Sequence, residues 1–389
     1  MTNQLVDPRG VVHGRAVERA LRPGKIPRNP RVGFLINEIN RQAGPDFYAY
    51  SLVIEDEMRK RIPDLEVLAS LHRLDPAHLD IGDLHWPVDA RDCALAEVDM
   101  LAGGIKSFGP QPLARFGMSW LARHAPPVVD RIALVHGDAG IANFLFAESR
   151  VTAAIDWEWS HLGDPIEDLG GLCIHASFSP SGDWPALLRH YGDVSGTPVD
   201  LDKVFYYRVN NMARSVLALV PIRQRVNARD PVALNLCFAV ICDRMLCEAI
   251  ADAMKIQLER PALPDLSDVT TLYDVVVENL GSDVAPHVDG EFPRDRLTTS
   301  ILLVQTLARE HELRSWREAT ELDELQQLLG ERPADLTSGY AALEEVIEHD
   351  DGARDEEILR ALGRIAFRSE AVAAPVVSLF PDARLRPIV

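Results

Sequence analysis

The sequence predicts an α+β protein that is mostly helical. Short apolar, β-branched runs at 131–135 and 151–155 predict two strands, while the stretches 204–220 and 234–254 have the length and apolar content of buried helices. The chain has 389 residues, of which 47% are hydrophobic and 25% charged. That size and composition indicate two or three globular domains with a sizeable core.

The predicted elements fall into three regions. Residues 1–65 are rich in Pro and Gly and show little regular pattern. A helix with Leu65, Leu68 and Leu71 on one face follows, and then the two strands and the long helices. After a Pro-flanked linker at 260–268, the pattern is helical to about residue 371.

The C-terminal third predicts an all-α bundle of about four or five helices. Within 294–313, apolar side chains recur at steps of four, three and four along one face, at Leu297, Ile301, Val304 and Ala308. Gly330 suits a helix C-cap, and Asp335 or Thr337 suits an N-cap. The region 263–389 is therefore expected to be a separate helical domain.

The charge distribution excludes some classes of partner. The net charge is −19, which argues against nucleic acid. From Asp265 onward, 26 acidic and 12 basic residues give −14, so the first 264 residues carry only −5. Most of the excess acidic residues therefore lie in the helical domain, and they do not indicate an acidic substrate pocket in the first 264 residues. No apolar run is long enough to span a membrane, no secretory signal is visible, and the five cysteines suit reduced core thiols, so we expect a cytoplasmic protein.

The stretch LVHGDAGIANFLF (134–146) concentrates polar side chains beside the first strand. His136, Asp138 and Asn143 lie in a loop, and Asp156 follows the second strand. The short apolar run FLF (144–146), the turn at 147–150 and the second strand predict a hairpin, which would bring Asn143 and Asp156 side by side. Mg²⁺ prefers such oxygen ligands, and Asp138 would then be left to accept a proton from a substrate hydroxyl. The alternative is a polar loop beside a core hairpin.

These residues resemble the aminoglycoside phosphotransferase family. The pattern H-G-D, four residues, N, and then I-D-W is present, and the segments HLGDPIEDLGGL and LASLHRLDPAHL resemble flanking family motifs. The resemblance implies a protein-kinase-like C-terminal lobe at 66–262. It also implies Asp138 as catalytic base, Asn143 and Asp156 as Mg²⁺ ligands, and ATP as phosphate donor.

Four further residues are implied as supports of this site. His136 would support the loop, and Asp164 and Asp168 would orient the segment after the metal site, with Asp168 capping the next helix. Glu158 would either contact substrate or serve as a structural or solvated carboxylate.

The nucleotide-binding half of a kinase-like site is reduced in this sequence. Residues 1–65 contain no G-x-G-x-x-G motif, and their only lysines, Lys25 and Lys60, lie in poor strand context. Residues 47–58 could be a remnant of the strand that joins the lobes. Three explanations stay open: a start codon placed too late, a lobe that is degenerate or supplied by another chain, and a non-catalytic relative.

The sequence therefore predicts an ATP- and Mg²⁺-dependent phosphotransferase that acts on a hydroxyl of a small molecule. The alternative is an impaired, pseudokinase-like binding or scaffold protein, and a weaker one is a metal-dependent hydrolase using Asp138 and Asp156. The helical domain could mediate self-association or bind a partner chain.

Overall fold

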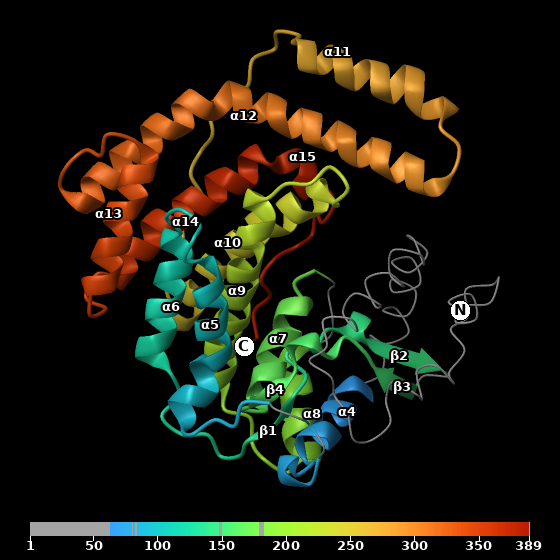
Figure 1. Ribbon diagram of the computed structural model, residues 1–389, viewed down its shortest axis with the longest axis vertical. Coiled ribbons are helices and arrows are strands. Elements are labelled where there is room, and N and C mark those ends of the chain that lie inside the picture. Colours follow the sequence, from blue (N-terminus) through green and yellow to red (C-terminus); the bar gives the residue numbers. More distant parts are fainter. Residues whose placement is uncertain (1–62, 80, 82–83, 148–149, 179–182, 389) are drawn as a thin grey trace. The chain divides into compact units, whose positions relative to one another are not determined.

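The computed structural model describes residues 63–79, 81, 84–147, 150–178 and 183–388 (Figure 1). Most of them are helical and a few short strands accompany the helices, which confirms the expected α+β, mostly helical class. The reduced N-terminal segment 1–65, with Lys25, Lys60 and the strand remnant expected at 47–58, lies almost wholly outside the described residues.

The described residues form two compact units that interleave along the chain. The first unit contains the described residues up to Cys93, those of Pro127–Val204, and 387–388. The second contains Ala94–Pro126 and Phe205–Arg386. This grouping assigns the helices on both sides of residue 262 to one unit. The domain boundaries inferred from the sequence stay a prediction.

The first unit contains all four strands among the described residues. β1 (Ala133–Val135) pairs antiparallel with β4 (His161–Gly163), and β2 (Phe144–Ala147) pairs antiparallel with β3 (Arg150–Ala154). The predicted hairpin is thus confirmed. The other elements of the unit are α4 (Pro63–His72), η1 (Pro76–His78), η2 (Ile141–Asn143), η3 (Trp157–Trp159), α7 (Ile166–His175) and α8 (Trp184–Ser195).

A small apolar core holds β1 and β4 in place. Leu134 and Leu162, opposite each other in the register, are each 2% exposed and pack with Ile81 and Leu84. Burial of such side chains contributes about 1.5–3 kcal/mol each. The loop that leaves β1 therefore starts from a firmly seated strand.

The second unit is helical. Its described elements are α5 (Ala90–Ile105, whose first residues belong to the first unit), α6 (Pro112–His124), α9 (Leu201–Gln224, entering from the first unit), α10 (Val232–Met254), α11 (Leu272–Glu278), η4 (Asn279–Val284), η5 (Ala285–His287), α12 (Glu291–Leu329), α13 (Leu336–His349), α14 (Asp355–Val372) and α15 (Ala374–Val377). The predicted caps are confirmed: Gly330 ends α12 with φ 83°, and Asp335 begins α13 with a capping box. The five cysteines are buried and free, as expected.

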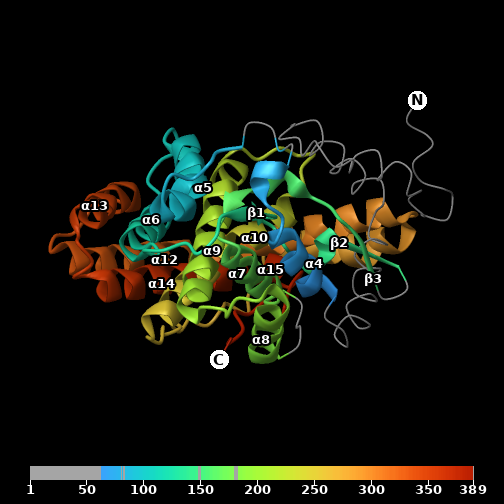
Figure 2. The ribbon, with the colours of Figure 1, turned by 90° about the horizontal axis from the view of Figure 1, so that it is seen from below.

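The hairpin of α11 and the N-terminal half of α12 carries few buried side chains. Figure 1 shows α11 along that half of α12, and Figure 2 shows the same pair from below. None of the residues of α11 is buried, and the first buried residue of α12 is Thr306. Within the described residues, no helix is both long and apolar enough to cross a membrane.

Candidate active site

The catalytic loop expected from the sequence lies between β1 and the β2–β3 hairpin. The hairpin returns the chain to the loop, because the Ile155 backbone N–H donates to the Asn143 carbonyl at 2.8 Å. Asp156 follows at once with φ 67° and ψ 52°, a left-handed conformation that few non-glycine residues adopt. The structure thus brings Asn143 and Asp156 together, although thirteen positions separate them in the sequence.

Asp138 is held at both carboxylate oxygens. Its Oδ1 lies 2.7 Å from His175 Nε2, and its Oδ2 accepts from Asn143 Nδ2 at 2.9 Å. Burial alone would raise the pKa of Asp138, but the charge and hydrogen bond of His175, helped by His136 and Asn143, lower it to about 2. Asp138 is therefore a fixed, ionised carboxylate at neutral pH.

His175 is a site residue that the sequence reasoning missed. It ends α7, and burial lowers its pKa less than the charge and hydrogen bond of Asp138 raise it. Its ring lies against Gly140, where an added Cβ would come within 2.5 Å of His175 Nδ1. The one available signal was the seven-residue spacing from Asp168 to His175, which places both on the same face of a helix.

A buried hydrogen-bond network fixes the start of the loop. The carboxylate of Asp168, 1% exposed, accepts from the backbone N–H groups of His136 at 2.8 Å and Gly137 at 2.9 Å. Its Oδ2 also lies 3.0 Å from His72 Nε2, and Tyr191 lies 2.6 Å from the other nitrogen of that ring. Burial opposes ionisation of Asp168, yet the contacts with His72 and the loop lower its pKa.

This network differs from the helix cap expected for Asp168. Asp168 lies in the first turn of α7, but its oxygens accept from the catalytic loop and from α4 instead. The start of α7 is bonded by Asp164, whose Oδ1 accepts from the Ile166 N–H at 3.0 Å and whose Oδ2 lies 3.1 Å from Lys203 Nζ. The role expected for Asp168 as a helix cap is therefore wrong, because its carboxylate instead accepts from the backbone N–H groups of His136 and Gly137.

His136 has the geometry of a loop support. Its Nε2 lies 2.9 Å from the Ile155 carbonyl oxygen, and its Nδ1 lies 3.3 Å from the Asp138 backbone nitrogen. In these contacts the Nδ1 atom accepts from the Asp138 backbone N–H and the Nε2 atom faces the carbonyl oxygen as a donor. The ring is fully buried, so it joins the loop to the end of β3 and does not face solvent.

The side chains of Asp156 and Glu158 interact with each other. Hydrogen bonding to Asp156, together with burial and the charges of Asp156 and Asp138, raises the pKa of Glu158 to about 8. Asp156 Oδ1 is buried without a hydrogen-bond partner. An unsatisfied carboxylate oxygen beside a second carboxylate fits a divalent cation, which would supply the absent partner and relieve the repulsion.

The donor set is small. Among the described residues, no three His, Cys, Asp or Glu side chains form a group that could hold a metal ion by themselves. The residues at hand are the Asn143 amide oxygen and the Asp156 carboxylate. This limited set suits Mg²⁺, which usually keeps several waters and takes one or two carboxylates plus substrate phosphates.

Comparisons with known proteins agree with this site. Residues 65–204 match the model of the phosphotransferase enzyme family. Acyl-CoA dehydrogenase family member 10 of Mus musculus is 31% identical over 140 residues, 30% of this chain and 13% of that protein. Acyl-CoA dehydrogenase family member 11 is 50% identical over 52 residues in Gallus gallus (13% of this chain, 7% of that protein) and 35% over 86 residues in Homo sapiens (20% and 10%).

These matches cover parts of longer proteins. The matched segments span 7–13% of the length of the three curated relatives. A solved structure from Ralstonia eutropha, described as a candidate aminoglycoside phosphotransferase, is 24% identical with a TM-score of 0.42, covering 50% of this chain and 64% of that one. The match to the phosphotransferase enzyme family model spans the loop at 136–143, both strand pairs and α7.

Proposed function

We propose that this protein transfers a phosphoryl group from ATP, with Mg²⁺, to a hydroxyl group of a small molecule, in the cytoplasm. The observation that supports this most is the convergence of three oxygen-bearing side chains of different sequence origin. Asp138 and Asn143 are hydrogen-bonded to each other, and the hairpin returns Asp156 beside them. Phosphoryl transfer depends mainly on positioning and charge stabilisation, which such an arrangement can supply.

Asp138 has the properties required to orient a substrate hydroxyl. Its lowered pKa keeps it ionised, and contacts with His175 and Asn143 hold its two oxygens in place. The side chain still exposes 31% of its surface, so a hydroxyl group can approach. We propose that Asp138 accepts the hydroxyl proton as the substrate oxygen bonds to the γ-phosphorus of ATP, while the bond from that phosphorus to the bridging oxygen breaks and ADP leaves.

Asn143 and Asp156 are the residues that would hold Mg²⁺. The Asn143 Nδ2 donates to the Asp138 backbone oxygen at 2.7 Å as well as to its side chain, which leaves the amide oxygen as the metal donor. Asp156 offers its unpartnered Oδ1. The bound ion would neutralise charge on the transferring phosphate. Glu158 then stands beside the site as a carboxylate that the ion would help to ionise.

Thermal shift with ATP tests the proposal. We expect millimolar ATP to raise the melting temperature only when Mg²⁺ is present, and Asp156→Ala to abolish that rise. Asp193→Ala, which removes an exposed aspartate from α8 of the same unit, is the matched control and should keep it. A rise that survives Asp156→Ala, or no rise in the wild-type protein, contradicts the proposal.

Asp138→Asn separates binding from chemistry. This variant should retain the Mg²⁺-dependent ATP shift but lose phosphorylation of any accepted alcohol, because an amide cannot take the proton. Retained turnover would refute the assignment of Asp138 as base.

A binding or scaffold role is the second candidate, and the α11–α12 hairpin favours it. Among the described residues, eight of the sixteen exposed large apolar side chains lie between residues 266 and 307: Leu266, Val269, Leu272, Val275, Val276, Val284, Phe292 and Leu307. Such concentration typically marks an interaction surface. We propose self-association through this hairpin.

Light scattering tests that role. Leu272→Asp, at a side chain that is 83% exposed, should lower the measured mass of an oligomer, whereas Leu74→Asp in the other unit should not. A monomeric wild-type protein at all concentrations would exclude self-association.

A further inference from the structure

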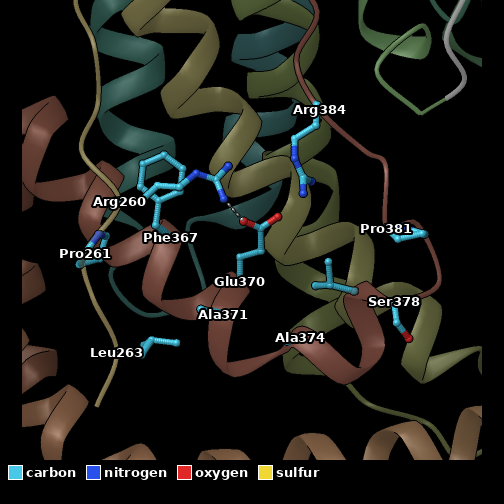
Figure 3. Close-up of a pocket in the computed structure, with 11 residues that line it drawn as sticks. Arg260, Pro261, Leu263, Phe367, Glu370, Ala371, Ala374, Ser378, Pro381 and Arg384 are labelled. Carbon is cyan, nitrogen blue, oxygen red and sulfur yellow. Dashed lines mark ion pairs between the residues drawn. The ribbon is translucent and has the colours of Figure 1, made fainter. Parts of the chain in front are cut away.

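The helical unit contains a cavity of about 350 Å³ that the proposed chemistry does not use. Figure 3 shows it between the segment after α10, helices α14 and α15, and the C-terminal segment. Its walls are mainly apolar and include Leu263, Phe367, Val377 and Pro381. This volume lies at the lower end of the range of about 300–1,000 Å³ that is typical of small-molecule sites.

Polar groups gather at one side of the cavity. In Figure 3 the side chains of Arg260 and Arg384 extend toward Glu370 from two different segments. The Arg260 guanidinium also lies 4.8 Å from the Phe367 ring centroid. The site therefore combines an apolar wall with a charged corner.

Arg244, Arg260, Glu248 and Glu370 form an ion-pair network at this corner. Glu370 pairs with the buried Arg244 at 2.7 Å, Arg244 pairs with Glu248 at 2.5 Å, and Arg260 lies 3.4 Å from Glu248 and 3.8 Å from Glu370. Two guanidinium groups thus share two carboxylates, and their charges cancel.

Arg384 adds one positive charge that this network does not neutralise. Its Nη1 donates to the carbonyl of the preceding residue at 2.6 Å, and among the described residues it forms no ion pair with a carboxylate within 4.0 Å. Arg244 Nη2 donates to the same carbonyl at 2.9 Å, which anchors the backbone next to Arg384. The exposed Arg384 thus places a cation beside an apolar cavity within a region whose net charge is −14.

We propose that this cavity binds a small carboxylate with an apolar chain. The carboxylate would bond to the Arg384 guanidinium, whose planar fork matches its two oxygens. The chain would cover Phe367 and Val377 and remove apolar surface from water. This ligand complements both the unpaired charge and the apolar wall, and the site is independent of the phosphotransfer chemistry proposed for the first unit.

Isothermal titration calorimetry of the full chain with octanoate tests the proposal. We expect saturable binding of octanoate and at least about tenfold weaker binding of 1-octanol, which has the same chain without the charge. Arg384→Gln should weaken octanoate binding by about tenfold. Ala374→Leu, which adds bulk at the cavity wall, should abolish it.

A matched control keeps the test specific. Arg314→Gln removes an exposed arginine from α12 of the same unit, outside the cavity lining, and should bind octanoate as the wild-type protein does. Absence of octanoate binding to the wild type overturns the proposal. Equal binding of 1-octanol overturns it too, because the charge would then play no part. Octanoate binding that Arg384→Gln, Ala374→Leu and Arg314→Gln all retain also overturns it, because the cavity would then play no part.

Discussion

The contact between Gly140 and His175 allows a sharp test of how Asp138, the proposed catalytic base, is held. Gly140 has φ −75°, a conformation open to any residue, so glycine is required there for space and not for backbone freedom. In Gly140→Ala the new Cβ would lie 2.5, 2.6 and 2.8 Å from three atoms of the His175 ring. Ordinary contact distances between such atoms are about 3.5–4.0 Å, so the ring must move by about 1 Å.

That displacement is large enough to break the bond to Asp138. The His175 Nε2 to Asp138 Oδ1 distance is 2.7 Å, and an added ångström takes it beyond hydrogen-bonding range. A hydrogen bond to a charged group contributes about 1.5–3 kcal/mol. The two side chains are 35% and 31% exposed, so solvent reduces this to about 1 kcal/mol.

A double-mutant cycle isolates this effect. The free energy of unfolding is measured by urea denaturation for the wild type, Gly140→Ala, His175→Ala and the double variant. Gly140→Ala should cost about 1 kcal/mol or more alone and much less beside His175→Ala, because the smaller side chain removes the clash. An equal cost on both backgrounds would refute the reasoning, since the strain would then lie in the loop backbone.

The pH dependence follows from the two pKa shifts. Asp138 has a lowered pKa of about 2, so its contribution is present above the unfolded value of 3.8 and is lost as the pH falls toward 2. His175 has a raised pKa, so its contribution is present below the unfolded value of 6.5 and is lost as the pH rises through the folded value. The wild type should therefore exceed Gly140→Ala in stability most between about pH 4 and 6.5.

Three further predictions concern the same site. Gly137→Ala should destabilise the protein by about 3 kcal/mol or more in urea denaturation, because Gly137 has φ 79° and its new Cβ would lie 2.2 Å from the Trp159 carbonyl oxygen; a cost below 1 kcal/mol would contradict the geometry. Asp168→Asn should cost about 2–4 kcal/mol, since an amide cannot accept from all its present donors; thermal unfolding at near wild-type temperature would exclude the network. Asp156→Asn should lower the pKa of Glu158 from about 8 toward 4.5, as measured by carbon NMR of the side-chain carboxyl, because asparagine tolerates the left-handed backbone but carries no charge. An unchanged pKa would show that Asp156 is not the partner of Glu158.

Local patterns predicted the secondary structure well. The strands near 131–135 and 151–155, the hairpin of 144–147 with 150–154, the caps at Gly330 and Asp335 and the long apolar helices all depend on short-range periodicity and turn chemistry. The pairing of β1 with β4 was not predicted, because three-residue strands carry little pattern and their partners are distant in sequence. The grouping of the helices into units depends on long-range packing for the same reason.

The sequence by itself determined the chemical identity of the candidate site. The H-G-D loop, Asn143 and the Asp that follows the hairpin could be located because their spacing is set by local turns and one hairpin. Only the tertiary structure decided how these groups are held. His175 reaches Asp138 across 37 positions, and His72 reaches Asp168 across 96. No local pattern encodes such contacts, because they exist only once buried charges from distant segments must find partners inside the folded chain.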